Sequence, residues 1–464
     1  MWEKRMDNAA LMAMWTQVYD DFEPMRAADA SQRVARRPYN SIAELVVKKL
    51  RLGINNRKFI LAGGIGSGKS TELRAVLEDI RVTKNVLLID LWDHYSKSVR
   101  DPKALEQIEA VELVGLLGLA TLRFGRDAAG LRWGELERRF SDALNKQQRP
   151  VGEGQAPVLD VPKLASALAI TVGLAAVDPI GGVVAGLLGD KLTKGAIMAL
   201  QKLNDSWEWK VGLGGRPARG DQDDAVRALF EATNALLDHL YQMTGKPLVL
   251  VVDGLDRVQG IDVFLQLVVH SRLLVDLHAD LVLTLDLGLV QRHNAMLRGW
   301  TPHAFTVVPV AKRDDPYTPD PRGVDFLAQV AEHRFARLGH PMLISRPQLK
   351  RLACYSAGSV RDFIMLVRDT AEQVMMDGGE GPTDDTIHIV LDQYRRSQEA
   401  GLNRAHIACL EGVLADPNRR LPEGDLPAEL VNRQLLLAYP NESTWYLPHT
   451  ALIWKMLRRP GPST

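Results

Sequence analysis

Five short apolar runs, separated by segments with helical periodicity, constrain the fold of this chain more than any other feature. Each run is apolar almost throughout instead of alternating with polar residues, as strands are when both faces of a sheet are covered. Such strands, joined by helical segments, are typical of a parallel sheet flanked by helices. We therefore predict an α/β fold with strands at Lys58–Ala62, 86–90, 248–252, 281–285 and 305–308.

Helical patterns fill most of the remaining chain. Residues 223–241 carry apolar side chains at helical spacing, and Gly245 and Pro247 then end the helix. The capping-box pattern of residues 41–44 predicts a helix start near the first strand. From residue 402 onward, a helix, a loop, a short helix and two β-type runs around an Asn-Glu-Ser turn predict a small winged-helix-like module.

These patterns divide the chain into four parts. We expect an N-terminal helical segment at 1–57, a core at 58–324 with an inserted helical region at 95–220, an all-helical lid at 325–399, and a winged-helix-like module at 400–464.

Composition excludes several classes of protein. With 46% hydrophobic and 25% charged residues, the chain of 464 residues has the composition of a globular protein and is not largely disordered. The 57 basic and 57 acidic residues cancel, which excludes binding to nucleic acid by bulk positive charge. Two cysteines cannot build a disulfide framework or a cysteine-rich zinc site. With no signal peptide visible in residues 1–20, we expect a cytoplasmic protein.

An apolar stretch at 164–189, inside the insertion, contains Asp178 as its sole charged residue. It is long enough to cross a bilayer, but Asp178 and Pro179 interrupt it at the middle. Each half alone is too short to span the hydrocarbon. We expect a helical hairpin that is buried or faces a partner, with membrane insertion as the alternative.

The glycine-rich loop after the first strand carries the clearest chemical signal. It matches the pattern G-x-x-x-x-G-K-[ST] and lies between a predicted strand and a predicted helix. Glycines let backbone N–H groups turn toward a di- or triphosphate, and the following helix adds its positive end. We expect Lys69 to bind the β- and γ-phosphates and Ser70 to bind Mg²⁺. The predicted nucleotide-binding residues are Gly63, Gly64, Ile65, Gly66, Ser67, Gly68, Lys69, Ser70 and Thr71.

Two carboxylates follow the third predicted strand. Asp253 ends an apolar run and Asp256 comes three residues later. A strand end beside a phosphate-binding loop is where a magnesium shell is completed, so we expect Asp253 to bind the metal through water. Asp256 is placed to orient or deprotonate the attacking water. The alternative is a turn that carries solvated acids.

The pattern of apolar strand, Asp253, small residue, apolar residue and Asp256 resembles the second acidic motif of STAND ATPases, which are signal-transducing relatives of AAA+ proteins. Those proteins commonly carry one more acidic residue where this chain has Arg257. The resemblance covers about residues 40–390 together with the winged-helix-like end. It implies ATP as substrate and Mg²⁺ as cofactor.

The same resemblance implies three further catalytic residues. Thr284 occupies the place of a polar sensor residue, and Arg298 lies where AAA+ ring proteins often keep an arginine finger. Arg361, in the segment Ala-Gly-Ser-Val-Arg-Asp-Phe, is similar to the second sensor of origin-recognition-type ATPases. The residues alone also allow an ordinary structural interpretation of each. Thr284 could be a β-branched residue of a strand, Arg298 a solvated cation at a helix end, and Arg361 a partner in an ion pair.

The long insertion between Lys69 and Asp253 resembles that of KAP ATPases, which carry apolar helices at this point. We predict an ATP-hydrolysing switch or assembly ATPase that acts in bacterial or antiviral defence or in signalling. We expect it to form a homo-oligomer and to work with a protein partner. A DNA-remodelling or loading ATPase is the second hypothesis, and a non-hydrolysing nucleotide-binding scaffold the third. Membrane contact is not favoured.

Overall fold

The strand-like runs meet in one sheet in the computed structural model, which describes residues 8–24, 37–38, 42–99, 101–147, 170–172, 224–258, 260–439 and 445–458. The strand order is β3-β2-β4-β5-β1-β6, and every neighbouring pair except β2 and β3 is parallel. The α/β fold predicted from the apolar runs is confirmed. The strands are β1 (Lys58–Ala62), β2 (Asn85–Asp90), β3 (Ile170–Val172), β4 (Leu248–Asp253), β5 (Asp280–Leu285) and β6 (Thr301–Ala304).

The chain divides into two units. One consists of Leu45–Ala62 and Val76–Ala304 and contains the whole sheet. The other consists of Met1–Glu44, Gly63–Ala75 and Phe305–Thr464, so the glycine-rich loop groups with the C-terminal half of the chain.

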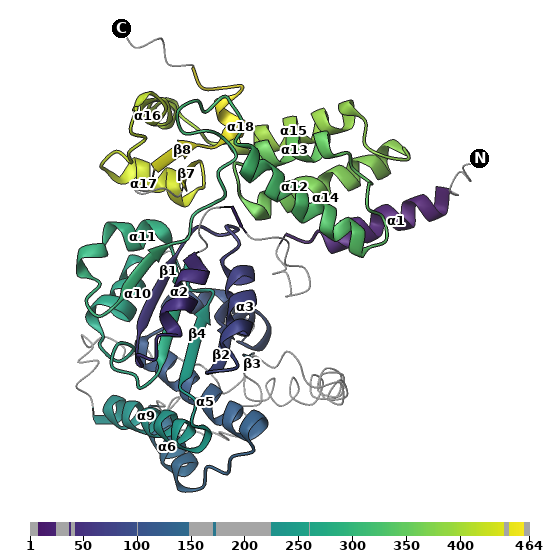
Figure 1. Cartoon of the computed structure of the whole chain (residues 1–464). Helices are drawn as coiled ribbons and strands as arrows, with labels where there is room; N and C mark the ends of the chain where they lie inside the picture. The colour runs from purple at the N-terminus through teal and green to yellow at the C-terminus, as the bar shows by residue number, and fades with distance from the viewer. Residues whose placement is uncertain are drawn as a thin grey trace, which may run out of the picture. The chain divides into compact units, whose positions relative to one another are not determined.

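Three helices of the sheet-bearing unit pack on one another through small residues. They are α5 (Ala110–Ala129), α6 (Glu135–Lys146) and α9 (Asp224–Thr244), which Figure 1 shows side by side. Added Cβ atoms on Gly115 and Gly118 of α5 would lie 3.2 and 2.2 Å from side chains of α6, so glycine allows the close approach. The shorter elements are α2 (Ile42–Leu50), α3 (Lys69–Ile80), α4 (Leu91–Asp93), α10 (Ile261–Phe264) and α11 (Leu287–Arg292), with π-helices at His94–Val99 and Leu265–His270 and 3₁₀ helices at Pro102–Gln107, Leu255–Arg257 and Asn294–Met296.

The predicted lid is helical in the second unit. Its helices are α12 (Pro321–Arg337), α13 (Arg346–Tyr355), α14 (Val360–Asp377) and α15 (Asp384–Glu399). The N-terminal helix α1 (Asn8–Asp21) packs on α14, and in Figure 1 it lies, in purple, beside the green lid helices. Trp15 and Phe22 are buried there, and the rings of Phe22 and Phe335 are 5.1 Å apart. Residues far apart in sequence thus share one apolar core.

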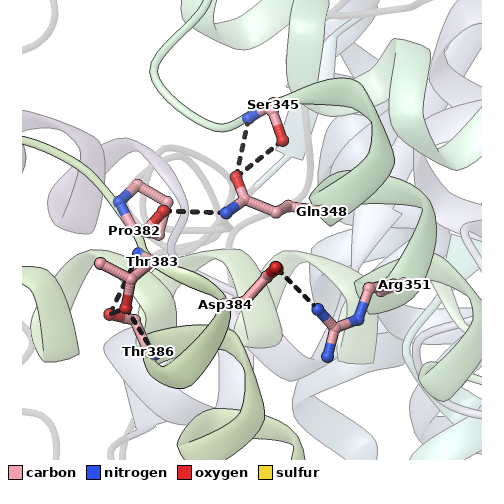
Figure 2. Close-up of polar contacts among 7 residues, drawn as sticks. All are labelled: Ser345, Gln348, Arg351, Pro382, Thr383, Asp384 and Thr386. Atoms are coloured by element: carbon pink, nitrogen blue, oxygen red, sulfur yellow. Dashed lines mark hydrogen bonds and ion pairs between the residues drawn. The ribbon is translucent and has the colours of Figure 1, made fainter.

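The first turns of α13 and α15 are joined by hydrogen bonds. Ser345 and Gln348 form a capping box, and Nε2 of Gln348 also donates to the carbonyl oxygen of Pro382 at 2.8 Å. Arg351 donates to Asp384 at 2.8 Å, across the same junction. These contacts fix the two helix starts against each other. Figure 2 shows them for Ser345, Gln348, Arg351, Pro382, Thr383, Asp384 and Thr386.

The C-terminal module has the predicted order of elements. It contains α16 (Arg404–Ala415), α17 (Asp425–Asn432), the antiparallel strands β7 (Leu436–Tyr439) and β8 (Trp445–Pro448), and α18 (Thr450–Ile453). Polar contacts connect it to the lid, among them a hydrogen bond from Thr450 of α18 to the carbonyl oxygen of Cys354 at 2.5 Å. Tyr439 donates to the carbonyl oxygen of Ala357 at 2.7 Å, and Tyr394, which donates to Asp362, lies 3.1 Å from Nε2 of His449.

The strand predicted at 305–308 is wrong. Phe305, Val307 and Val308 are buried, but the segment is not in the sheet. The backbone N–H of Val308 instead donates to the carbonyl oxygen of Gly358 next to α14. The strand is β6, immediately before, and it pairs with β1 at the end of the sheet order. Its sequence Thr-Pro-His-Ala carries no apolar run, and Pro302 is tolerated because an edge strand needs donors on one side alone.

The apolar stretch at 164–189 lies largely outside the described residues. Its described part, Ile170–Val172, is not helical as predicted but forms β3, antiparallel to β2. In the described ranges no helix combines the length and the apolar character that crossing a bilayer requires.

Candidate functional site

The glycine-rich loop, residues 63–68, leaves the carboxyl end of β1 and enters α3. Gly66 and Gly68 have φ values of +83° and +92°, a region that residues with a Cβ adopt only at a cost. A Cβ on Gly66 would also lie 2.6 Å from Cβ of Arg361. Backbone conformation and close packing therefore both require glycine at position 66.

All six carbonyl groups of the loop accept hydrogen bonds. Nζ of Lys69 donates to the carbonyl oxygens of Gly63 and Gly64, both at 2.8 Å. A loop with engaged carbonyl groups presents its N–H groups to an anion. The other four carbonyl groups accept as follows: that of Ile65 from Nε2 of Gln434, that of Gly66 from the N–H of Arg361, that of Ser67 from the guanidinium of Arg37, and that of Gly68 from the N–H of Glu72.

Arg361 reaches the loop from the start of α14. Its backbone N–H donates to Gly66 at 3.2 Å, and Ser359 caps the same helix. The structure thus brings the predicted second sensor together with the glycine-rich loop. The action of its guanidinium on a nucleotide stays a prediction.

The side chains around the loop fit a phosphate group. Lys69 and Ser67 are 3% and 1% exposed, and Oγ of Ser67 has no hydrogen-bond partner among the described residues. Ser70 and Thr71 lie half-buried in the first turn of α3. A buried ammonium and an unpartnered hydroxyl at a helix N-terminus would both gain acceptors from phosphate oxygens.

The acidic strand end lies in the other unit. Oδ1 of Asp253 accepts from Oγ1 of Thr284 at 2.9 Å and from the N–H of Gly254 at 3.0 Å. Thr284 is fully buried, and its hydroxyl accepts in turn from Gly254 at 3.0 Å. The structure therefore places the predicted sensor, Thr284, against the predicted metal ligand, Asp253. Asp256 lies half-buried in the 3₁₀ turn that follows.

Arg257, in the place of an additional acid, packs on a tryptophan. Its guanidinium lies 4.2 Å from the ring centre of Trp92. Gly254 has a φ of +96°, and a Cβ there would lie 2.9 Å from the backbone nitrogen of Trp92. The turn after β4 is thus fitted closely to the turn after β2.

Asp90 is a carboxylate at this sheet edge that the sequence analysis did not select. It pairs in register with Asp253, and its side chain caps α4 by accepting from Asp93 at 3.0 Å. Its position at the end of a predicted strand was a usable signal. In the described ranges no three His, Cys, Asp or Glu side chains group into a metal site.

Arg298 lies exposed in the turn before β6, where its N–H donates to Met296 at 2.8 Å. The structure does not bring Arg298 to the other predicted residues of its unit. Its role as a finger for a neighbouring subunit stays a prediction.

Arg37 and Gln434 were not predicted from the sequence. They lie 30 positions before and 369 positions after their partners in the loop. Neither belongs to a motif. Both donate to backbone carbonyl groups, which leave no mark in the side-chain pattern, so no sequence signal identified them.

The five parallel strands and the glycine-rich loop after β1 define the class of fold, which is that of P-loop NTPases. No family model matches the chain, and no curated protein is similar to it in sequence. Solved structures that are similar in part include the following two. The Aeropyrum pernix ORC2 protein in its ADP form is 12% identical with a TM-score of 0.39 over 93% of this chain and 94% of that one. Drosophila ORC bound to DNA is 11% identical with a TM-score of 0.36 over 97% and 93%. These similarities are too low to assign a family.

Proposed function

We propose that this chain binds MgATP at the glycine-rich loop and hydrolyses it. The observation that carries the proposal is the loop itself, in which Gly66 and Gly68 have positive φ values and after which Lys69 lies buried at the start of a helix. Adenine is proposed over guanine because the chain has no N/T-K-x-D base-reading motif.

Each residue has a proposed role in binding. Lys69 would exchange the carbonyl groups of Gly63 and Gly64 for oxygens of the β- and γ-phosphates. Ser70 and Asp253 would hold Mg²⁺, which offsets negative charge on the phosphoryl group. Because Thr284 donates to Asp253, it would fix the orientation of that carboxylate.

Hydrolysis requires a group that acts on water. We assign this role to Asp256, which would orient the attacking water and accept its proton as the bond between the γ-phosphorus and the ADP oxygen breaks. Arg361, and Arg298 from a neighbouring subunit, would stabilise the negative charge that develops.

The roles of the two acids can be separated by isosteric changes. Asp256→Asn is expected to slow hydrolysis much more than it weakens ATP binding, whereas Asp253→Asn makes binding depend less on Mg²⁺. Steady-state phosphate release and calorimetric titration, with and without Mg²⁺, measure both. Wild-type turnover by Asp256→Asn would exclude it as the group that activates water. ATP binding without turnover in the wild-type chain would favour the scaffold hypothesis.

We infer that hydrolysis drives a switch, because donors to the loop come from the lid and from the C-terminal module. Such a switch would act in the cytoplasm as a homo-oligomer with a protein effector, in bacterial defence or signalling. The helix-helix-hairpin order of the C-terminal module favours a DNA-loading ATPase as the second candidate. ATP-dependent binding of labelled duplex DNA, measured by fluorescence anisotropy, would support the second candidate, and its absence the first.

A further inference from the structure

Two side chains outside the glycine-rich motif donate hydrogen bonds to backbone carbonyl groups of the loop. Arg37 donates to the carbonyl oxygen of Ser67 at 2.9 Å and to that of Thr306 at 3.0 Å. Its guanidinium also lies 4.4 Å from the ring centre of Phe305. It therefore ties the glycine-rich loop to the chain segment that leads toward the lid.

Gln434 holds the loop at a second point. Its Nε2 donates to the carbonyl oxygen of Ile65, and a Cβ on Gly64 would lie 3.6 Å from the same nitrogen. Gln434 has a φ of +59°, although it is not glycine. Such a conformation costs free energy and persists where the surroundings require it, often at functional sites. Here the positive φ ends helix α17, because the N–H of Gln434 donates to Val431 and that of Leu435 donates to Leu430. The end of α17 thus holds the amide of Gln434 at the loop.

The two contacts determine where the loop N–H groups point. In a trans peptide the C=O of one residue and the N–H of the next point in opposite directions. No described peptide bond is cis. Fixing the carbonyl groups of Ile65 and Ser67 therefore turns the N–H groups of Gly66 and Gly68 to the opposite side of the loop. An anion would meet those N–H groups there.

Arg37 also brings charge close to the loop. Burial lowers the pKa of its guanidinium from 12.5 to about 10, and Glu72 opposes the shift. At neutral pH the side chain remains a cation. It would therefore favour an anionic ligand in addition to shaping the loop.

We propose that Arg37 and Gln434 are positioning residues that set the glycine-rich loop in its phosphate-accepting shape from outside the motif. This inference rests on the proposed nucleotide binding. Since Gln434 belongs to the C-terminal module, the shape of the loop depends on the position of that module.

The test compares ATP affinity with stability in the full chain. Gln434→Glu keeps the side-chain shape but removes the donor, and Arg37→Met removes both the donor and the charge. Each is expected to raise the dissociation constant for MgATP about tenfold, as the loss of one hydrogen bond in a closed site would. Arg37→Lys, which keeps the charge and a donor, should recover most of the affinity. Arg433→Met is the control, because Arg433 also donates to a carbonyl group, that of Ala400, but has no contact with the loop.

Gln434→Gly separates positioning from a purely structural role. Glycine accepts a positive φ, so this variant should keep its unfolding temperature and yet bind MgATP more weakly. The inference is overturned if folded Gln434→Gly and Arg37→Met bind MgATP like the wild-type chain while Lys69→Ala does not. If wild type and Lys69→Ala bind equally, the nucleotide site itself is wrong, which is a separate result.

Discussion

Replacing Thr284 by valine should destabilise the sheet-bearing unit through one buried hydrogen bond. The change is nearly isosteric, so it creates no cavity at this fully buried position. It removes the hydroxyl that donates to Oδ1 of Asp253 at 2.9 Å, and a hydrogen bond to a charged group contributes about 1.5–3 kcal/mol. Gly254 keeps its own bond to Asp253, so its N–H stays paired. We expect a loss of about 2 kcal/mol in the free energy of unfolding.

Thr233 offers a matched control in the same unit. It is also fully buried, on α9, but its Oγ1 has no hydrogen-bond partner within the described residues. Thr233→Val removes a buried, unsatisfied hydroxyl and should stabilise the protein by about 1 kcal/mol. Urea unfolding followed by tryptophan fluorescence compares the two variants. If both shift the unfolding midpoint in the same direction and by the same amount, the bond between Thr284 and Asp253 does not contribute as we argue.

Two further changes test the loop and a buried acid. Gly66→Ala should weaken MgATP binding more than tenfold, because Gly66 has a φ of +83° and is in close contact with Arg361. Gly53→Ala is the control: its φ is +70°, but no atom lies within 4 Å, so it should cost only about 1 kcal/mol of stability and leave binding intact. Calorimetry and thermal unfolding distinguish the two variants, and equal MgATP binding by both would contradict the role of packing at Gly66. Burial raises the pKa of Glu112, which accepts from Tyr95, from 4.5 to about 7. The folded chain then binds this proton more tightly than the unfolded chain does, so stability should fall as pH rises from about 4.5 to about 7, and Glu112→Gln should remove that dependence. A pH series of urea unfolding measures it, and an unchanged slope in the variant would refute the assignment.

The buried strands could be predicted because their apolar runs report burial on both faces. The predictions for β1, β2, β4 and β5 agree with the structure to within one residue. The error at 305–308 arises because an apolar run reports burial but not what covers it. Phe305 and Val308 are buried in the lid-bearing unit, while β6 lacks an apolar signal altogether.

The glycine-rich loop was predictable because its conformation depends on residue type. Positive φ values at Gly66 and Gly68 require glycine, so the conformation appears in the sequence. Arg37 and Gln434 were not predictable, since each bonds a carbonyl group that any residue would supply. Asp90 was predictable in part. It ended a predicted strand, but the neighbours of that strand in the sheet were unknown until the order β2-β4 was seen.

Calorimetric titration of MgATP into the full-length protein and its Lys69→Ala variant tests nucleotide binding most directly. Lys350→Ala is the control, because Lys350 pairs with Asp325 in the lid. The wild-type protein and Lys350→Ala should bind with equal affinity. Lys69→Ala should weaken binding about a hundredfold, as expected when charge-assisted hydrogen bonds to phosphate are lost. The variant also loses the bonds from Lys69 to Gly63 and Gly64, so thermal unfolding must first show that it is folded at the temperature of the titration. Equal affinity of Lys69→Ala and wild type would contradict the account.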